Sequence, residues 1–225
     1  MDMYPFQFHG HDLQALASGG LYWGTQRLLV VSDLHLGKSE RIARRGGSLL
    51  PPFEVLETLS RLTDLVDALD PLEVICLGDS FDDLAAVEAL EEPDFAEIKR
   101  LAAGRIWTWI EGNHDAGPLS VPGSHLAERR LQNLTFRHIA QPGAVAEVSG
   151  HYHPKQRVAV GRARPCFLLD GNRIILPAFG TYTGGLQACD KVFDPLFATD
   201  ARAVLTGARA IVYPRQLPSK ARNPA

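Results

Sequence analysis

The stretch Gln26-Arg27-Leu28-Leu29-Val30-Val31-Ser32-Asp33 is a short apolar run that ends in a polar residue. Such a run is typical of a buried strand of a parallel sheet, and it delivers a carboxylate at its carboxyl end. Two later runs, 72–79 and 105–113, have the same design. Open α/β sheets build their sites where several strands present polar residues at one edge. The sequence therefore predicts an α/β fold with a polar site at three strand ends.

Helical patterns separate these three runs. In 53–69 the apolar residues follow helical spacing and predict one amphipathic helix. A second helical pattern covers 82–90 and 95–101, and Pro93 interrupts it. The alternation of strand and helix supports the α/β assignment.

After residue 113 the pattern changes to short strands separated by turn residues. We expect strands at 136–139, 157–160, 166–169 and 173–176. Asp170-Gly171-Asn172, between the last two, is a hairpin signal. We expect two sheets packed face to face with helices outside, in one domain over residues 1–213. Residues 214–225 are rich in Pro, Lys and Arg and are expected to be a disordered tail.

The composition is ordinary for a soluble globular protein, with 225 residues, 45% hydrophobic and 22% charged. A net charge of -3 offers no whole-molecule reason to expect nucleic acid or anionic membrane as a partner. Three cysteines without CxxC spacing argue against a disulfide framework and a cysteine zinc site. Neither a signal peptide nor a membrane-spanning stretch is visible. We therefore expect a cytoplasmic protein.

Five short motifs that suit metal binding follow one another along the chain: Asp33-Leu34-His35, Gly78-Asp79, Gly112-Asn113-His114-Asp115, His138 and Gly150-His151-Tyr152-His153. Carboxylate, imidazole and amide ligands suit a pair of divalent transition metals. Each motif alone is weak, because an Asp-x-His pair or a Gly-Asp more often serves hydrogen bonding or a turn. Five of the 8 histidines lie in these motifs. Their joint occurrence argues against a set of satisfied core histidines.

The spacing within the motifs suggests how two ions are shared. Alternation in an extended strand would place Asp33 and His35 on one side, where both reach one ion. Asp79 follows a glycine, which leaves room for its carboxylate to bridge two ions. His151 and His153 can each serve a different ion if the backbone turns there. A bridged pair lies about 3.5–4 Å apart and activates a shared hydroxide for in-line attack on phosphorus.

The order and content of the motifs resemble the calcineurin-like metallophosphoesterase superfamily. The resemblance implies an αββα sandwich of two mixed sheets flanked by helices. It also implies two ligand sets: Asp33, His35, Asp79 and His153 for the first ion, and Asp79, Asn113, His138 and His151 for the second. A surface strand histidine remains the alternative for His138.

The same resemblance implies two catalytic residues. His114 would be the histidine outside the ligand set that stabilises the phosphoryl oxygens or protonates the leaving oxygen. Asp82 matches the superfamily position that orients this histidine, and Asp83 is the alternative. Asp115 is interpreted as a structural residue beside the ligands.

A closer resemblance, to the bacterial DNA ligase-associated metallophosphoesterases, covers most of the chain. It rests on 21–23, 29–38, 150–154, 165–167 and above all on Pro177-Ala178-Phe179-Gly180-Thr181-Tyr182-Thr183-Gly184-Gly185. That group implies a DNA-damage-response phosphodiesterase or endonuclease, with an ATP-dependent DNA ligase, an exonuclease and a helicase as pathway partners. The sequence departs from the group at Arg137-His138-Ile139-Ala140, where a Cys-His-His-Pro-like stretch is usual, and 116–134 matches nothing.

Basic residues follow two of the metal motifs. Lys38 and Arg41 come after the Asp-x-His motif, and Lys155 and Arg157 come after Gly-His-x-His. A basic rim beside an acidic metal centre would contact a DNA backbone. The alternative is an ordinary solvated face.

Three functions remain open at this stage. The first is a binuclear metal-dependent phosphodiesterase or endonuclease that acts on DNA in repair, with Mn²⁺ favoured by the resemblance and Fe, Zn²⁺ or Co²⁺ equally compatible with the ligands. The second is a small-molecule phosphodiesterase or a nucleotide or lipid pyrophosphohydrolase on the same metal core. The third is a metal-binding scaffold without catalysis, against which the non-ligand His114 argues.

Overall fold

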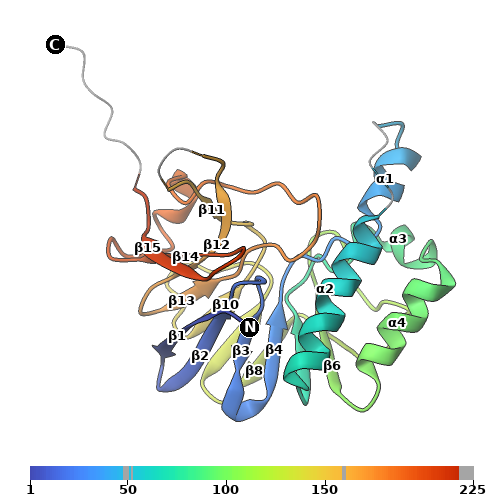
Figure 1. The fold of residues 1–225 in the computed structure, drawn as a ribbon, viewed down its shortest axis with the longest axis horizontal. Coiled ribbons are helices and arrows are strands. Elements are labelled where there is room, and N and C mark those ends of the chain that lie inside the picture. The colour runs from blue at the N-terminus through green and yellow to red at the C-terminus, as the bar shows by residue number, and fades with distance from the viewer. Residues whose placement is uncertain (48–50, 52, 159–160, 218–225) are drawn as a thin grey trace.

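The computed structural model describes residues 1–47, 51, 53–158 and 161–217. Two mixed sheets pack face to face (Figure 1). The first sheet has the order β1 (Met3–Phe8), β2 (His11–Leu16), β3 (Leu21–Trp23), β4 (Leu28–Val31), β5 (Glu73–Cys76), β6 (Ile106–Ile110) and β7 (Ser124–Leu126). Strands β1 to β4 pair antiparallel, and β4 to β7 pair parallel. The three predicted ligand-bearing strands are therefore parallel neighbours in one sheet.

The second sheet also mixes parallel and antiparallel pairs. Its strands are β8 (Glu128–Leu131), β9 (Leu134–Arg137), β10 (Glu147–Ser149), β12 (Arg164–Leu169), β13 (Arg173–Ile175), β14 (Arg202–Leu205) and β15 (Ile211–Pro214), in the order β15-β14-β12-β13-β10-β9-β8, and β11 (Lys155–Gln156) pairs with β12. Strand β10 is parallel to β9 and β13. The predicted hairpin is confirmed, because β12 and β13 pair antiparallel and Asp170 Oδ1 accepts the Asn172 N–H at 2.8 Å.

The main core lies between the two sheets and follows the two-residue period of the strands. Leu28 and Val30 of β4 face it together with Phe167 and Leu169 of β12. The other face of β4 packs against helices. Burial on both faces explains why this strand is an uninterrupted apolar run.

Helices α2 (Glu54–Leu69), α3 (Leu84–Glu88) and α4 (Glu92–Ala102) pack on the outer face of the first sheet (Figure 1). Helix α1 (Lys38–Arg44) lies beyond them, in contact with α3. The predicted helix over 53–69 is confirmed by α2. Pro93 lies in the first turn of α4, where its missing N–H leaves no helical hydrogen bond unmade. The proline therefore divides the second helical pattern into two helices. None of the helices in the described chain has the length and apolar character needed to cross a membrane.

The outer face of the second sheet differs from the expected layer of helices. In the described residues it is covered by loops and the 3-10 helix η2 (Lys191–Phe193). Phe193 and Phe197 pack there against Cys166 and Leu168. The predicted α/β architecture of two mixed sheets is confirmed, and its α-helical cover lies on the first sheet.

Several elements were missing from the sequence-based expectation. Strands β1 to β3 extend the first sheet with an antiparallel hairpin, η1 (Gly24–Gln26) links β3 to β4, and β7 and β8 come from the unmatched segment 116–134. The strand expected at 157–160 is displaced to β11, and residues 159–160 lie outside the described residues. Strands β10, β14 and β15 were also not expected. Strands of three to six residues carry too few periods to be located from sequence, even where they form local hairpins, as β1 does with β2 and β8 with β9.

The tail expected to be disordered from residue 214 begins as ordered structure. Pro214 ends β15, and Arg215 is buried. The Arg215 guanidinium donates to the Ala188 carbonyl at 2.7 Å and to Asp194 Oδ1 at 2.9 Å. The expectation is therefore wrong for these first positions, because paired burial of one arginine outweighs a polar composition. Residues 218–225 lie outside the described residues.

We predict that Phe167→Ala destabilises the inter-sheet core. Phe167 is fully buried, so its truncation should lower the free energy of unfolding by about 3–5 kcal/mol. Urea denaturation of the metal-free protein measures this. Phe53→Ala is the matched control, because Phe53 is 62% exposed and should change stability by less than about 0.5 kcal/mol. Equal destabilisation by the two variants would contradict the assigned core.

Candidate metal centre

The predicted ligands follow the carboxyl ends of neighbouring strands. Asp33 comes after β4, Asp79 after β5, Asn113 after β6 and His151 after β10. Because β4, β5 and β6 are parallel, their carboxyl ends share one edge of the first sheet. Gly150 N donates to the His138 carbonyl at 3.0 Å, which joins the two histidine segments of the second sheet.

The ligand loops are wound tightly, with alternate residues in the left-handed region. Positive φ angles of 53°, 47°, 46°, 72° and 45° occur at Asp33, His35, Asp79, His151 and His153. Such backbone costs about 1–3 kcal/mol per residue and is held by its surroundings. Here His35 N donates to the Asp79 carbonyl at 2.9 Å. The expected extended strand through Asp33 and His35 is therefore wrong, since β4 ends at Val31. A coiled loop brings the two side chains together instead.

Two groups of ligand atoms result. Asp33, His35 and His153 form the first group, with His153 Nε2 at 3.2 Å from Asp33 Oδ1 and at 3.4 Å from His35 Nε2. Within each group the ligand atoms lie within 4.8 Å of one another. His151 and His153 fall into different groups, as expected if the backbone turns between them.

The second group contains Asp79, His138 and His151. His138 Nε2 lies 3.3 Å from Asp79 Oδ2 and 3.2 Å from His151 Nδ1. Asn113 Oδ1 is 3.1 Å from the same His138 nitrogen. The structure therefore places the four residues predicted for the second ion side by side. His138 is buried here and is not a surface strand histidine.

Hydrogen bonds on the far ring nitrogens orient two imidazoles. His138 Nδ1 donates to the Leu77 carbonyl at 2.8 Å, and His35 Nδ1 donates to Asp82 Oδ1 at 2.7 Å. A carbonyl oxygen only accepts, so the His138 proton resides on Nδ1 and the Nε2 lone pair points into its group. Such outer partners are the usual companions of metal-binding histidines.

The residues present fit a pair of divalent cations. Asp33 Oδ1 is buried without a hydrogen-bond partner among the described residues. Ring nitrogens of different histidines face one another at 3.2 and 3.4 Å, which a cation between them explains. The donor set of carboxylate and imidazole, with one amide nearby, suits Mn²⁺, Fe, Zn²⁺ or Co²⁺.

The charges within the site compensate one another. Burial disfavours the ionised form of Asp33, yet electrostatic attraction from His153 and His138 leaves the pKa of Asp33 below its usual value. Burial opposes ionisation of Asp79 as well, and His138 with the His114 backbone N–H lowers the pKa of that carboxyl. Burial lowers the pKa of His138, but Asp79 and Asp33 raise it overall. Both carboxylates are therefore anionic at neutral pH, as cation binding requires.

His114 lies beside both groups without joining either. Its ring packs edge-on to His35 with centroids 5.4 Å apart, and its Nδ1 donates to the backbone carbonyl of Asp82 at 2.9 Å. Asp82 thus contacts His114 through the main chain, whereas the Asp82 carboxylate bonds to His35 and Arg41. The alternative, Asp83, caps α3 instead.

Asp115 joins the loops that follow β5 and β6. Its carboxylate accepts four backbone N–H groups, from Asp79 at 3.1 Å, Ser80 at 2.7 Å, Phe81 at 3.1 Å and Gly112 at 2.9 Å. Burial raises the pKa of Asp115, and the N–H donors oppose that rise. The structural role expected for Asp115 is therefore the alignment of two ligand loops.

The imidazole of His138 leaves room only for a glycine at the position before Asp79. Gly78 has a φ of 78°, and a Cβ there would lie 2.5 Å from His138 Nδ1. The glycine of the Gly-Asp motif is therefore explained by the close packing of the His138 imidazole on the Gly78 backbone.

The segment 177–185 packs on both metal loops. Phe179 N donates to the Ser32 carbonyl at 2.8 Å, and Gly180 N donates to the Asp33 carbonyl at 3.0 Å. At its other end, a Cβ on Gly185 would lie 2.1 Å from the His153 carbonyl oxygen. Sequence similarity singled out this segment without indicating its place, and the structure puts it against the metal ligands.

The four basic residues expected to contact substrate have different surroundings. The Arg41 guanidinium donates a hydrogen bond through Nε to the Asp82 carboxylate. Lys155 Nζ donates to the Thr183 carbonyl at 3.0 Å, and burial lowers the pKa of Lys155. Lys38 opens α1 and is half-buried, while Arg157 is exposed. Arg157 and Lys38 are therefore the more accessible members of the expected basic rim.

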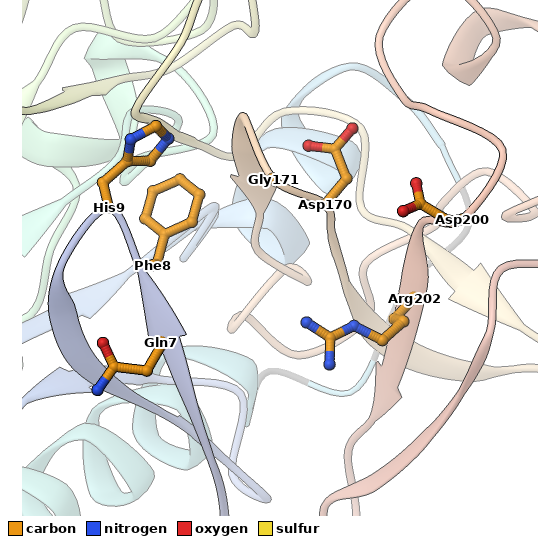
Figure 2. A pocket seen from close by; sticks show the side chains of 7 residues that line it. All are labelled: Gln7, Phe8, His9, Asp170, Gly171, Asp200 and Arg202. Atoms are coloured by element: carbon orange, nitrogen blue, oxygen red, sulfur yellow. The ribbon is translucent and has the colours of Figure 1, made fainter.

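A cavity of about 460 Å³ lies away from this centre (Figure 2). Its lining is Gln7, Phe8, His9, Asp170, Gly171, Asp200 and Arg202. Three successive antiparallel pairings make β1 run opposite to β4, so the carboxyl end of β1 is at the other edge of the sheet. The cavity shares no residue with the two ligand groups.

Comparisons with known proteins agree with this geometry. The family model described as calcineurin-like phosphoesterase matches residues 26–196. The crystal structure of nuclease MPE from Pseudomonas putida is similar at a TM-score of 0.72 and 29% identity, covering 91% of this chain and 96% of that one. A phosphoesterase of E. coli, Yfce, matches at a TM-score of 0.39 and 16% identity over 84% of this chain and 99% of that one, which is too low to support an argument. No curated protein matches the chain.

We predict that Asp115→Asn weakens the joint between the two ligand loops. The amide nitrogen would face two of the four backbone N–H groups, so the free energy of unfolding should fall by about 1–3 kcal/mol. Urea denaturation of the metal-free protein measures the loss. Asp64→Asn on the exposed side of α2 is the control and should leave stability unchanged. A wild-type unfolding curve for Asp115→Asn would contradict this role.

We also predict that Gly180→Ala displaces the segment 177–185 from the metal loop. A Cβ on Gly180 would lie 2.0 Å from the Leu34 carbonyl oxygen, whereas a Cβ on Gly184 meets nothing within 4 Å. Gly180→Ala should therefore retain less Mn²⁺ after dialysis, as measured by elemental analysis, and Gly184→Ala should retain as much as the wild type. Equal Mn²⁺ retention by both variants would count against the packing argument.

Proposed function

This chain belongs to the calcineurin-like phosphoesterase family and is a metal-dependent phosphoesterase, and we propose that it is a binuclear phosphodiesterase that cleaves DNA. The observation that supports DNA as the substrate is the similarity to a nuclease along nearly the whole of both chains, at 29% identity. The segment 177–185, which the DNA ligase-associated group shares, packs on the ligand loops and supports the same substrate class.

Exposure at the metal centre is compatible with a large substrate. Asn113 is exposed, and His114, His151 and His153 are half-buried, whereas Asp33 and His138 are buried. The site is thus closed on the sheet side and open to solvent on the side of the loops. An extended phosphodiester backbone reaches such a site without entering a deep cavity.

Each residue group has a proposed task. Asp33, His35 and His153 would hold one ion, His138 and His151 with Asn113 would hold the other, and Asp79 would contribute its carboxylate to both. Two bound ions supply an activated water nucleophile and neutralise charge on the phosphoryl oxygens. Mn²⁺ is the proposed metal.

His114 is the proposed catalytic acid. Its Nδ1 is fixed by the Asp82 carbonyl, and this contact leaves Nε2 to face the substrate. A protonated His114 would stabilise a phosphoryl oxygen and give its Nε2 proton to the leaving oxygen. The backbone N–H of His114 donates to Asp79 Oδ1 at 2.9 Å, which holds this ring beside the ligands.

The proposed setting is DNA repair in the cytoplasm. The ATP-dependent DNA ligase, exonuclease and helicase of the same pathway are proposed partners on the strength of the sequence resemblance.

The test is cleavage of end-labelled single-stranded DNA, a nicked duplex and bis-p-nitrophenyl phosphate with added Mn²⁺. We expect the wild type to cleave DNA and the aryl diester. Asp79→Asn should lose more activity than any other single ligand change, because it alone is assigned to both ions. His114→Ala should lose about 10²–10⁴-fold in rate while it keeps its metal content, because general acid catalysis contributes that much.

The alternative functions have distinct outcomes in the same assay. Turnover of the aryl diester without cleavage of any DNA form would move the substrate to small phosphodiesters. A wild-type protein that binds Mn²⁺ and cleaves nothing would indicate a scaffold. Full activity of Asp79→Asn would show that the ligand assignment is wrong.

A further inference from the structure

The basic helix α1 faces the loop that carries the metal ligand Asp79. The Arg41 guanidinium pairs with Asp82, and Arg44 pairs with Asp83 at 2.8 Å. The Arg41 side chain is 19% exposed, against 40% for Arg44 and 62% for Arg45. Arg41 is therefore the least exposed of the three arginines at the end of α1, and its side chain points into the protein.

The partner of Arg41 is a fully buried carboxylate with two neighbours. Asp82 Oδ1 accepts the His35 Nδ1 proton at 2.7 Å, and Asp82 Oδ2 accepts from Arg41 Nε. One carboxylate thus connects a guanidinium to an imidazole whose other nitrogen faces the first ligand group. A buried carboxylate without a cationic partner is strongly disfavoured. Arg41 therefore fixes the Asp82 carboxylate from the side opposite to His35, so the placement of that carboxylate against the imidazole depends on Arg41.

Helix α1 is itself fixed on two sides. A Cβ on Gly37 would lie 2.6 Å from the Ala86 Cβ, so the start of α1 is in close contact with α3. Ser39 N donates to Glu54 Oε1 at 2.9 Å, and Ser39 Oγ donates to Glu54 Oε2 at 2.5 Å, which ties α1 to α2. The Arg41 side chain therefore extends toward Asp82 from a helix that is packed on α3 and hydrogen-bonded to α2.

We propose that Arg41 is a positioning residue of the metal centre, which acts through Asp82 to fix the His35 imidazole for the ion held by Asp33, His35 and His153. This role replaces the substrate contact expected for Arg41 from sequence. Partners at this distance from a metal tune its affinity by about 10–100-fold. The inference rests on the proposed metal centre and is independent of DNA as the substrate.

The experiment is titration of the metal-free full-length protein with Mn²⁺ in a calorimeter. The proteins compared are the wild type, Arg41→Ala, Arg41→Lys and Arg45→Ala. We expect Arg41→Ala to weaken one of the two Mn²⁺ binding steps by about 10–100-fold and to leave the other step near its wild-type value. Arg41→Lys should recover part of the loss, because it restores the charge without the planar guanidinium.

Two controls separate positioning from a general loss of structure. Arg45→Ala removes a guanidinium from the same basic run and should bind both ions as the wild type does. In a double-mutant cycle, adding Arg41→Ala to Asp82→Asn should weaken Mn²⁺ binding no further than Asp82→Asn alone, because Arg41 acts through that carboxylate. Thermal melts of the metal-free variants establish that each one is folded.

Several results would overturn the inference. One is unchanged Mn²⁺ affinity in Arg41→Ala with a raised KM for bis-p-nitrophenyl phosphate, which would return Arg41 to substrate binding. Another is an equal loss at both ions together with a lowered melting temperature of the metal-free variant. A wild type that binds no Mn²⁺ would overturn both this inference and the metal centre. Mn²⁺ binding as expected with no DNA cleavage would contradict only the DNA substrate.

Discussion

Three carboxylates buried at one edge of a sheet set the conditions that the rest of the site meets. Asp33, Asp79 and Asp82 are at most 2% exposed, and each must be compensated to stay ionised. The compensation for Asp33 and Asp79 comes from imidazoles and backbone N–H groups, and for Asp82 from His35 and Arg41. A pair of divalent ions would add positive charge beside Asp33 and Asp79, which accounts for the burial of these acids at one place.

The backbone around these acids is strained and is held by polar contacts. Five predicted ligands have left-handed φ angles, which a short unconstrained loop would not keep. The Asp115 carboxylate accepts hydrogen bonds from backbone N–H groups of the loops after β5 and β6. The segment 177–185 donates hydrogen bonds to the loop after β4. Ordered supports of this kind keep ligand atoms in place before an ion arrives, so binding requires little rearrangement.

The fold could be predicted where the sequence pattern is local. The helix over 53–69, the three parallel strands and the Asp170 hairpin follow from periodicity and turn residues. Strands β1 to β3, β7, β8, β10, β14 and β15 were missed, because strands of three to six residues carry too few periods to stand out, even where they pair locally, as β1 does with β2 and β8 with β9. The tail was expected to be disordered because its charge was visible and the partners of Arg215 were not.

By itself the sequence determined the family, the order of the ligand motifs and which residue types can hold a metal, because these depend on chemical identity and spacing. Only the tertiary structure decided how they are used. In the structure, His151 and His153 lie in different ligand groups. The Asp82 carboxylate accepts from His35, and the Asp82 carbonyl accepts from His114. Arg41 points inward and donates to the Asp82 carboxylate. These choices depend on side-chain direction and on contacts between residues far apart in the chain, which no local pattern encodes.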